Sequence, residues 1–235
     1  MRLSMARSYG NSASRVERRG RIFVHILVLM LALMTMGPAF AGAEAGKPIK
    51  LVVLGDSLSA GLGLSASDAF PAKLQKALND KGLKVEMTNA GVSGDTSSGG
   101  RDRLDWSVAD GTEAVIVELG ANDALRGIDP SVTRQALTEI VQRLKARGIA
   151  VMLCGMLAPP NYGADYAARF NSIYPDLSKK FDVPLYPFFL DGVAADARLN
   201  QADGIHPTAA GVDIVVANIM PTVEAFLRNI SEQRR

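Results

Sequence analysis

The 235-residue chain contains little cysteine, histidine or aromatic side chain. Cys154 is the only cysteine, which excludes a disulfide within the chain, and we interpret it as a buried, small apolar residue. The only histidines are His25, near the N-terminus, and His206. One histidine in the rest of the chain is too few for an ordinary histidine-based zinc site. Aromatic residues make up only 6% of the chain, so we expect no aromatic-rich binding surface.

The chain also lacks the excess of basic residues that nucleic-acid binding requires. Its net charge of +2 arises at the N-terminus, because residues 1–41 contain six arginines and one glutamate. The other residues contain 20 basic and 23 acidic side chains. This balance does not favour binding to phosphates, so we expect no nucleic-acid partner.

Residues 1–41 have the pattern of a secretory signal peptide. A basic region ends at Arg21, the apolar run IFVHILVLMLALMTM follows, and Ala39-Phe40-Ala41 forms a small–x–small cleavage pattern. We predict cleavage after Ala41, with Ala43 as the alternative. The apolar run is shorter than the roughly 20 residues of a membrane span, so an uncleaved anchor is the less favoured interpretation. The mature domain would then comprise residues 42–235 and be periplasmic or secreted.

The mature part alternates between short apolar runs and longer amphipathic stretches. Strands are predicted at residues 49–55, 83–91, 113–123, 149–155 and 183–189. Helices are predicted at 69–82, 129–148, 164–182 and 207–229, with Pro175 dividing or kinking the third and Pro221 bending the last. This alternation predicts an α/β fold, a flavodoxin-like three-layer α/β/α sandwich with a five-stranded parallel sheet.

Polar or glycine-rich stretches follow the first three strands at their carboxyl ends, where ligands bind in such sheets. Ser57 follows the first strand in GDSLSAGLG, Gly94 the second in NAGVSGDTSSGG, and Asn122 the third in GANDALRG. On these residues alone, a capped turn at Ser57, a solvent loop at Gly94 and an Asx-turn at Asn122 remain alternatives to a functional site. The serine stretch is neither a G-x-S-x-G elbow nor a phosphate loop.

The motif DGIHP at 203–207 contains the one histidine of the predicted mature chain. Asp203 precedes His206 by three residues, so its carboxylate could reach the imidazole and fix its tautomer. Pro207 is predicted to be the first residue of the closing helix. A serine nucleophile needs a base that titrates near neutrality, and His206 is the natural candidate.

Together these four stretches resemble the sequence blocks of the GDSL/SGNH hydrolase superfamily. GDSLS, NAGVSGDTS, GAND and DGIHP occur in the family order and at family-like spacing. The likeness continues through VELGANDALRG, PPNYG and IYPDLSKKFDVPLYPFF, and covers about residues 48–228. It is closest to the multifunctional acyl-CoA thioesterase, lysophospholipase and arylesterase branch.

The resemblance implies a hydrolase that forms an acyl-enzyme on Ser57. His206 would take the proton of the serine hydroxyl, and Asp203 would orient His206. The backbone N–H groups of Ser57 and Gly94 and the side-chain amide of Asn122 would form the oxyanion hole. The chemistry needs no metal and no cofactor.

The expected substrate is a small-molecule ester or lipid. Export away from cytosolic acyl-CoA favours aryl, short-chain and lysophospholipid esters over acyl-CoA thioesters. Leu157 in the apolar segment GMLAPP, with Tyr162 and Tyr166, could form a lip for the acyl chain or could simply pack as a loop. The alternative functions are a carbohydrate or peptidoglycan O-acetylesterase and a non-enzymatic flavodoxin-like binding module. We expect a monomer without a membrane span once the signal is removed.

Overall fold

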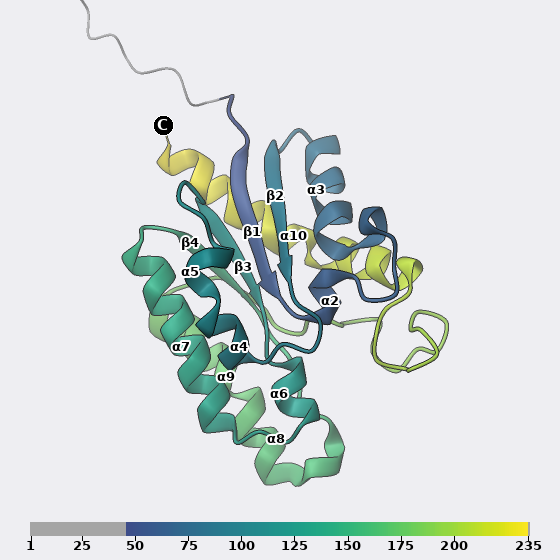
Figure 1. Cartoon of the computed structure of the whole chain (residues 1–235). Coiled ribbons are helices and arrows are strands. Elements are labelled where there is room, and N and C mark those ends of the chain that lie inside the picture. Colours follow the sequence, from purple (N-terminus) through teal and green to yellow (C-terminus); the bar gives the residue numbers. More distant parts are fainter. Residues whose placement is uncertain (1–45, 235) are drawn as a thin grey trace, which may run out of the picture. The chain divides into compact units, whose positions relative to one another are not determined.

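The fold is built on one parallel sheet of five strands. A computed structural model describes residues 46–234, so the predicted signal and its cleavage site at Ala41 lie outside the described residues. The strands are β1 (Ile49–Gly55), β2 (Val85–Gly91), β3 (Ala114–Glu118), β4 (Ala150–Cys154) and β5 (Leu185–Tyr186). All pairings are parallel, in the order β2-β1-β3-β4-β5 (Figure 1). The predicted flavodoxin-like α/β fold is confirmed.

Helices cover both faces of this sheet. On one face, α3 (Phe70–Asp80) packs against α10 (Ala209–Gln233). On the other face lie α4 (Ser97–Asp102), α7 (Pro130–Ala146) and α9 (Ile173–Phe181) (Figure 1). The remaining helices are α2 (Ser57–Ala60), α5 (Leu104–Ser107), α6 (Ala121–Leu125) and α8 (Gly163–Asn171), with short 3₁₀ turns at Ala66–Asp68 and Pro160–Tyr162.

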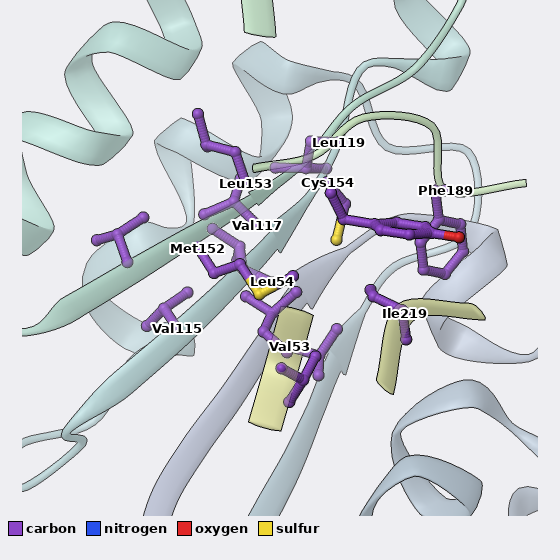
Figure 2. Close-up of a cluster of buried hydrophobic side chains, with 14 of the residues drawn as sticks. Val53, Leu54, Val115, Val117, Leu119, Met152, Leu153, Cys154, Phe189 and Ile219 are labelled. Atoms are coloured by element: carbon purple, nitrogen blue, oxygen red, sulfur yellow. The ribbon is translucent and has the colours of Figure 1, made fainter. Parts of the chain in front are cut away.

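Continuous apolar strands form the core, because the central strands of a parallel sheet covered on both faces are buried on both sides. Figure 2 shows Leu54, Val117 and Leu153, which come from three neighbouring strands, with Phe189 and Ile219 nearby; all five are buried. Cys154 lies in the same cluster and is buried, as predicted. At roughly 25 cal/mol per Å² of apolar surface, this burial is the main stabilising term of the fold.

Two predicted strands exceed the observed ones by more than two residues. The third ends at Glu118 rather than at residue 123, because Gly120 adopts φ +117° and the chain turns into α6. The fifth comprises only Leu185 and Tyr186. Pro184 and Pro187 flank these two residues, and proline has no N–H with which to extend the ladder.

Proline also shapes the helices, although not always where the sequence suggests. The helix predicted at 164–182 is divided at Ser172, three residues before Pro175. Pro175 lies in the first turn of α9, where a backbone N–H has no helical acceptor to lose. The prediction that Pro207 begins the last helix is wrong. Helix α10 begins at Ala209 under a Thr208 cap, while Pro207 forms an isolated bridge with Asn200.

Helix α10 is the one helix among residues 46–234 that is long and apolar enough to cross a membrane. Half of its most apolar stretch is buried inside the fold. Its buried side chains, among them Val215, Ile219 and Val223, belong to the hydrophobic core. Within this fold α10 is therefore a core helix.

Candidate active site

The predicted site residues are carried by elements that meet at the carboxyl edge of the sheet. Ser57 begins α2 directly after β1, and Asn122 lies in α6 after β3. The loop between β5 and α10 carries Asp203 and His206. Strand β1 lies between β2 and β3. The chain therefore places β2 on one side of β1 and then crosses over to place β3 on its other side. Such a switch point opens a crevice at the strand ends, where ligands bind in this class of sheet.

Ser57, His206 and Asp203 form a continuous chain of hydrogen bonds. The Oγ of Ser57 lies 2.9 Å from Nε2 of His206, and Nδ1 of His206 lies 2.7 Å from Oδ2 of Asp203. Because a carboxylate only accepts, Nδ1 carries a proton and the neutral imidazole offers Nε2 as acceptor to the serine hydroxyl. This arrangement can remove a proton from Ser57.

The loop that carries Asp203 and His206 is held by its own backbone. Oδ1 of Asp203 accepts from the backbone N–H groups of Ile205 at 2.9 Å and His206 at 3.0 Å. These two bonds, followed by the bond from the His206 ring, lower the pKa of Asp203 to about 2. The side-chain amide of Gln201 donates to the carbonyls of Leu62 and Pro207. The loop is thereby tied to the segment that follows α2.

Asn122 reaches the same cavity and is held by a neighbour of the serine. Its Nδ2 donates to Oδ2 of Asp56 at 3.2 Å, and its side chain lines the cavity beside Ser57 and His206. The amide nitrogen carries two hydrogens, so one N–H remains available to a ligand. The Asx-turn that Asn122 might have formed is replaced by this long-range contact with Asp56.

Gly94 lies in the loop after β2 with φ +83°, a conformation that side chains with Cβ rarely adopt. It is not among the residues that line the cavity. Its carbonyl accepts from Nη2 of the exposed Arg126 at 2.7 Å. The next residue, Asp95, accepts from Nε of Arg103 at 2.6 Å. The Gly94 loop is thus held by two arginines.

Arg103 is a buried residue that motif analysis misses. Besides Asp95, it donates to the carbonyl of Gly55 at 2.8 Å and that of Ala90 at 2.8 Å. These carbonyls lie at the ends of β1 and β2, so Arg103 joins the Gly94 loop to the strand that carries Ser57. No local pattern marks such a residue, because its partners come from distant parts of the chain.

The cavity beside Ser57 has a volume of about 440 Å³ and a mainly apolar lining. Leu157 lines it, as predicted, together with Leu58, Leu125, Met156, Phe188, Leu190 and Ile205. Tyr162 and Tyr166 are not among the lining residues. Tyr162 instead donates to the carbonyl of Leu125, and Tyr166 is buried with its hydroxyl bonded to the carbonyl of Ile128. The two tyrosines support the wall of the cavity from outside.

Two fully buried carboxyl groups, Asp56 and Glu118, lie behind the serine, and motif analysis misses both. Oε2 of Glu118 accepts from Ser59 Oγ at 2.7 Å and more weakly from the Asp56 backbone N–H at 3.4 Å, whereas Oε1 has no partner among the described residues. Gly55 makes room for this arrangement, since a Cβ there would come within 2.7 Å of Glu118 Oε2. A glutamate that ends an apolar strand at the ligand-binding edge is the signal that sequence analysis could have used.

Burial decides the ionisation of this pair. Loss of water raises the pKa of Asp56 to about 6, and hydrogen bonds from Leu58 and Asn122 oppose that rise. Burial, followed by the charge of Asp56, raises the pKa of Glu118 well above its ordinary value. Both shifts favour the neutral form and the larger one falls on Glu118, so Asp56 is the member of the pair that more readily carries a negative charge.

Known proteins share this sequence and this fold. The model of the GDSL-like lipase/acylhydrolase family matches residues 53–214, a stretch that includes Ser57, Asn122 and His206. The chain belongs to this family. It is 43% identical over 178 residues to esterase TesA of Pseudomonas aeruginosa, which spans 75% of this chain and 89% of that protein. It is 44% identical over 185 residues to thioesterase 1/protease 1/lysophospholipase L1 of Escherichia coli. This alignment spans 78% of this chain and 84% of that protein. A crystal structure of TesA aligns with a TM-score of 0.72 at 42% identity and covers 75% of this chain and 99% of that one.

Family membership identifies this GDSL-like protein as a serine hydrolase that acts on ester bonds of small molecules. The expected family, fold and reaction type are confirmed. A non-enzymatic binding module is not favoured, because the matched relatives are named as enzymes. An O-acetylesterase is not favoured, because the matched relatives are named as an esterase and as a thioesterase and lysophospholipase.

Proposed function

We propose that Ser57 is the nucleophile of the hydrolase, that His206 is its general base and that Asp203 orients the imidazole. The observation that carries this proposal is the chain of hydrogen bonds from Ser57 through His206 to Asp203 at the mouth of an apolar cavity. Ser57 Oγ attacks the ester carbonyl while its proton passes to His206 Nε2. The imidazolium that forms is stabilised by Asp203, which stays ionised.

The ester then breaks in two steps. His206 returns the proton to the oxygen of the leaving alcohol, and the acyl group remains bonded to Ser57 Oγ. A water molecule gives its proton to His206 and attacks the acyl carbon. The carboxylic acid leaves as the proton returns to Ser57. The proton given to the alcohol comes from Ser57 and is replaced by one from water, and His206 carries both.

The same proposal assigns the oxyanion hole to the backbone N–H groups of Ser57 and Gly94 and to the free N–H of Asn122. Asn122 lines the cavity beside the serine, which supports its part in this group. Fixed donors stabilise the charge that develops on the carbonyl oxygen, and loss of one donor typically lowers kcat by about 10²–10³-fold.

The cavity supports an apolar acyl group as the part of the substrate bound beside Ser57. Its lining side chains, including Leu58, Met156, Leu157 and Phe188, offer an apolar wall. We therefore propose esters of aryl alcohols and of fatty acids, including lysophospholipids, as substrates. The names of the matched relatives, esterase and thioesterase/lysophospholipase, fit this class.

Replacement of the serine tests the proposal. We expect Ser57→Ala to lower hydrolysis of p-nitrophenyl butyrate by at least about 10⁴-fold and to abolish labelling by a fluorophosphonate probe. Ser67→Ala is the matched control, because Ser67 is an exposed serine whose hydroxyl contacts only the nearby Ser65 side chain at 2.9 Å. Turnover of Ser57→Ala equal to that of the control would overturn the assignment.

Export and oligomeric state are proposed on the sequence. The basic, apolar and small-residue pattern of residues 1–41 supports a cleaved signal and a periplasmic or secreted monomer. A mature protein that begins with Gly42, seen by N-terminal sequencing, and a monomer mass from light scattering are the expected results.

A further inference from the structure

The carboxyl group of Asp56 connects the serine helix to the amide of Asn122. Its Oδ1 accepts from the backbone N–H of Leu58 at 2.9 Å, which caps α2. Its Oδ2 accepts from Nδ2 of Asn122 at 3.2 Å, across a separation of 66 residues. Asp56 is fully buried, whereas the Asn122 side chain extends from it into the cavity beside Ser57.

The charge of the Asp56 carboxylate determines which end of the Asn122 amide, nitrogen or oxygen, lies next to Asp56. An ionised carboxylate only accepts hydrogen bonds, so it holds the nitrogen of the amide and repels the oxygen. One N–H is then bonded to Asp56, and the other stays free. A neutral side chain at position 56 that could donate a hydrogen bond would favour the reversed orientation of the Asn122 amide, with Oδ1 in the place of Nδ2. A lone pair of Oδ1, and no N–H, would then face the oxyanion.

We propose that Asp56 is a positioning residue for ester hydrolysis, whose ionised carboxylate holds the Asn122 amide with an N–H directed at the developing oxyanion. This inference rests on the proposed function, in which Asn122 belongs to the oxyanion hole. Asp56 itself does not touch the substrate, since it is buried and is not among the cavity-lining residues.

The groups around Asp56 set when it is charged. From α6, Asn122 donates to it and the charge of Asp123 opposes its ionisation; from the loop before α10, a charged His206 favours it. Glu118, at the end of β3, is the other carboxyl of the pair, and the hydroxyl of Tyr174 lies in the same buried region. With its pKa raised to about 6, Asp56 is ionised at neutral pH and becomes neutral in mild acid.

A cap for α2 is the structural alternative, and one substitution separates the two roles. Asparagine caps helices about as well as aspartate does, so Asp56→Asn keeps the bond to the Leu58 N–H. It replaces the accepting Oδ2 with an amide that donates. A purely structural Asp56 would therefore tolerate asparagine, whereas a positioning Asp56 would not.

The experiment is a double-mutant cycle of Asp56→Asn and Asn122→Ala, assayed with p-nitrophenyl butyrate. We expect each single variant to lower kcat by about 10²-fold with KM changed by less than about threefold. Because both changes remove the same donor, the double variant should be about as slow as either single variant.

The melting temperature of Asp56→Asn should equal or exceed that of the wild type, because a buried charge is lost. Asp129→Asn is the matched control, since Asp129 caps α7 in the same way through the Ser131 N–H at 2.8 Å.

Three results would overturn the proposal. One is an Asp56→Asn variant with a kcat within about threefold of the wild type. Another is a double variant whose loss is the product of the single losses. The third is an Asp56→Asn variant whose pH–rate profile has the same shape as that of the wild type, because the variant should lack the loss of rate in acid that protonation of Asp56, with its pKa raised to about 6, adds to the wild type. If Asn122→Ala keeps the wild-type rate, it is the oxyanion assignment in the proposed function that fails.

Discussion

Two carboxyl systems flank Ser57 and His206, and they are built in opposite ways. Asp203 lies on a loop with 45% of its side chain exposed, and its pKa is lowered to about 2. Asp56 and Glu118 are fully buried on the other side of the serine, and the pKa of each is raised. The first system stabilises its charge with water and backbone N–H groups, whereas the second lacks water.

The difference shows which of the two systems is costly to keep ionised: the buried pair of Asp56 and Glu118. Asp203 keeps its charge throughout the working pH range without needing a buried partner. The buried pair opposes ionisation, and a raised carboxyl pKa means that the folded state binds protons more tightly than the unfolded state does. The stability contribution of this pair is therefore complete below the unfolded pKa and is lost as pH rises toward the folded pKa. We expect substitutions at Asp203 to affect mainly the rate, and those at Glu118 and its partner Ser59 to affect stability; Asp56 belongs to the buried pair but acts on the rate through Asn122.

The largest effect is expected from Asp203→Asn. The amide can donate to Nδ1 of His206 and so favour the wrong tautomer, which should lower kcat by up to about 10⁴-fold. The melting temperature should fall only slightly: asparagine still accepts from the backbone N–H groups of Ile205 and His206, but it lacks the charge that lowers the pKa of Asp203 and so contributes to stability. Asp196→Asn is the matched control, since Asp196 lies nearby on the same segment and its Oδ1 accepts from the Arg198 N–H at 2.9 Å. Equal rates for the two variants would show that Asp203 does not orient the base.

The exposed system was predictable from the sequence, and the buried one was not. Ser57, Asp203 and His206 lie in short motifs whose residue types already suggest their chemistry, and Asp203 and His206 are close in sequence. Glu118 contacts Ser59 and Asp56 across separations of 59 and 62 residues, so only the folded sheet brings them together. The first strand was predictable for a similar reason: its residues Leu51–Leu54 form an unbroken apolar run. The fifth strand was not, since its two flanking prolines limit a run that is otherwise apolar.

An intermediate effect, on stability alone, is expected from Glu118→Gln. Burial raises the pKa of Glu118, so the folded protein holds this proton to higher pH than the unfolded chain does, and the wild type should lose up to about 1.4 kcal/mol of stability per pH unit above the unfolded pKa. Glutamine removes this dependence. Urea unfolding should therefore show a stability gain over the wild type that grows between about pH 5 and pH 7, to roughly 1–3 kcal/mol. A gain that does not change with pH would mean that Glu118 is already ionised in the folded state. Ester hydrolysis should change by less than about threefold.

The smallest effect is expected from Ser59→Ala, which removes the 2.7 Å hydrogen bond to Glu118 Oε2. Ser59 stands two residues after the proposed nucleophile, yet its hydroxyl faces the buried pair. Loss of this one donor to a buried group should cost about 1–2 kcal/mol of unfolding free energy and leave kcat within about threefold of the wild type. Ser67→Ala again serves as the control. A large loss of kcat in Ser59→Ala without loss of stability would contradict this expectation, because the hydroxyl that contacts Glu118 would then act on the reaction itself. The expected result would place the boundary between the reacting groups and their supporting core within a single turn of α2.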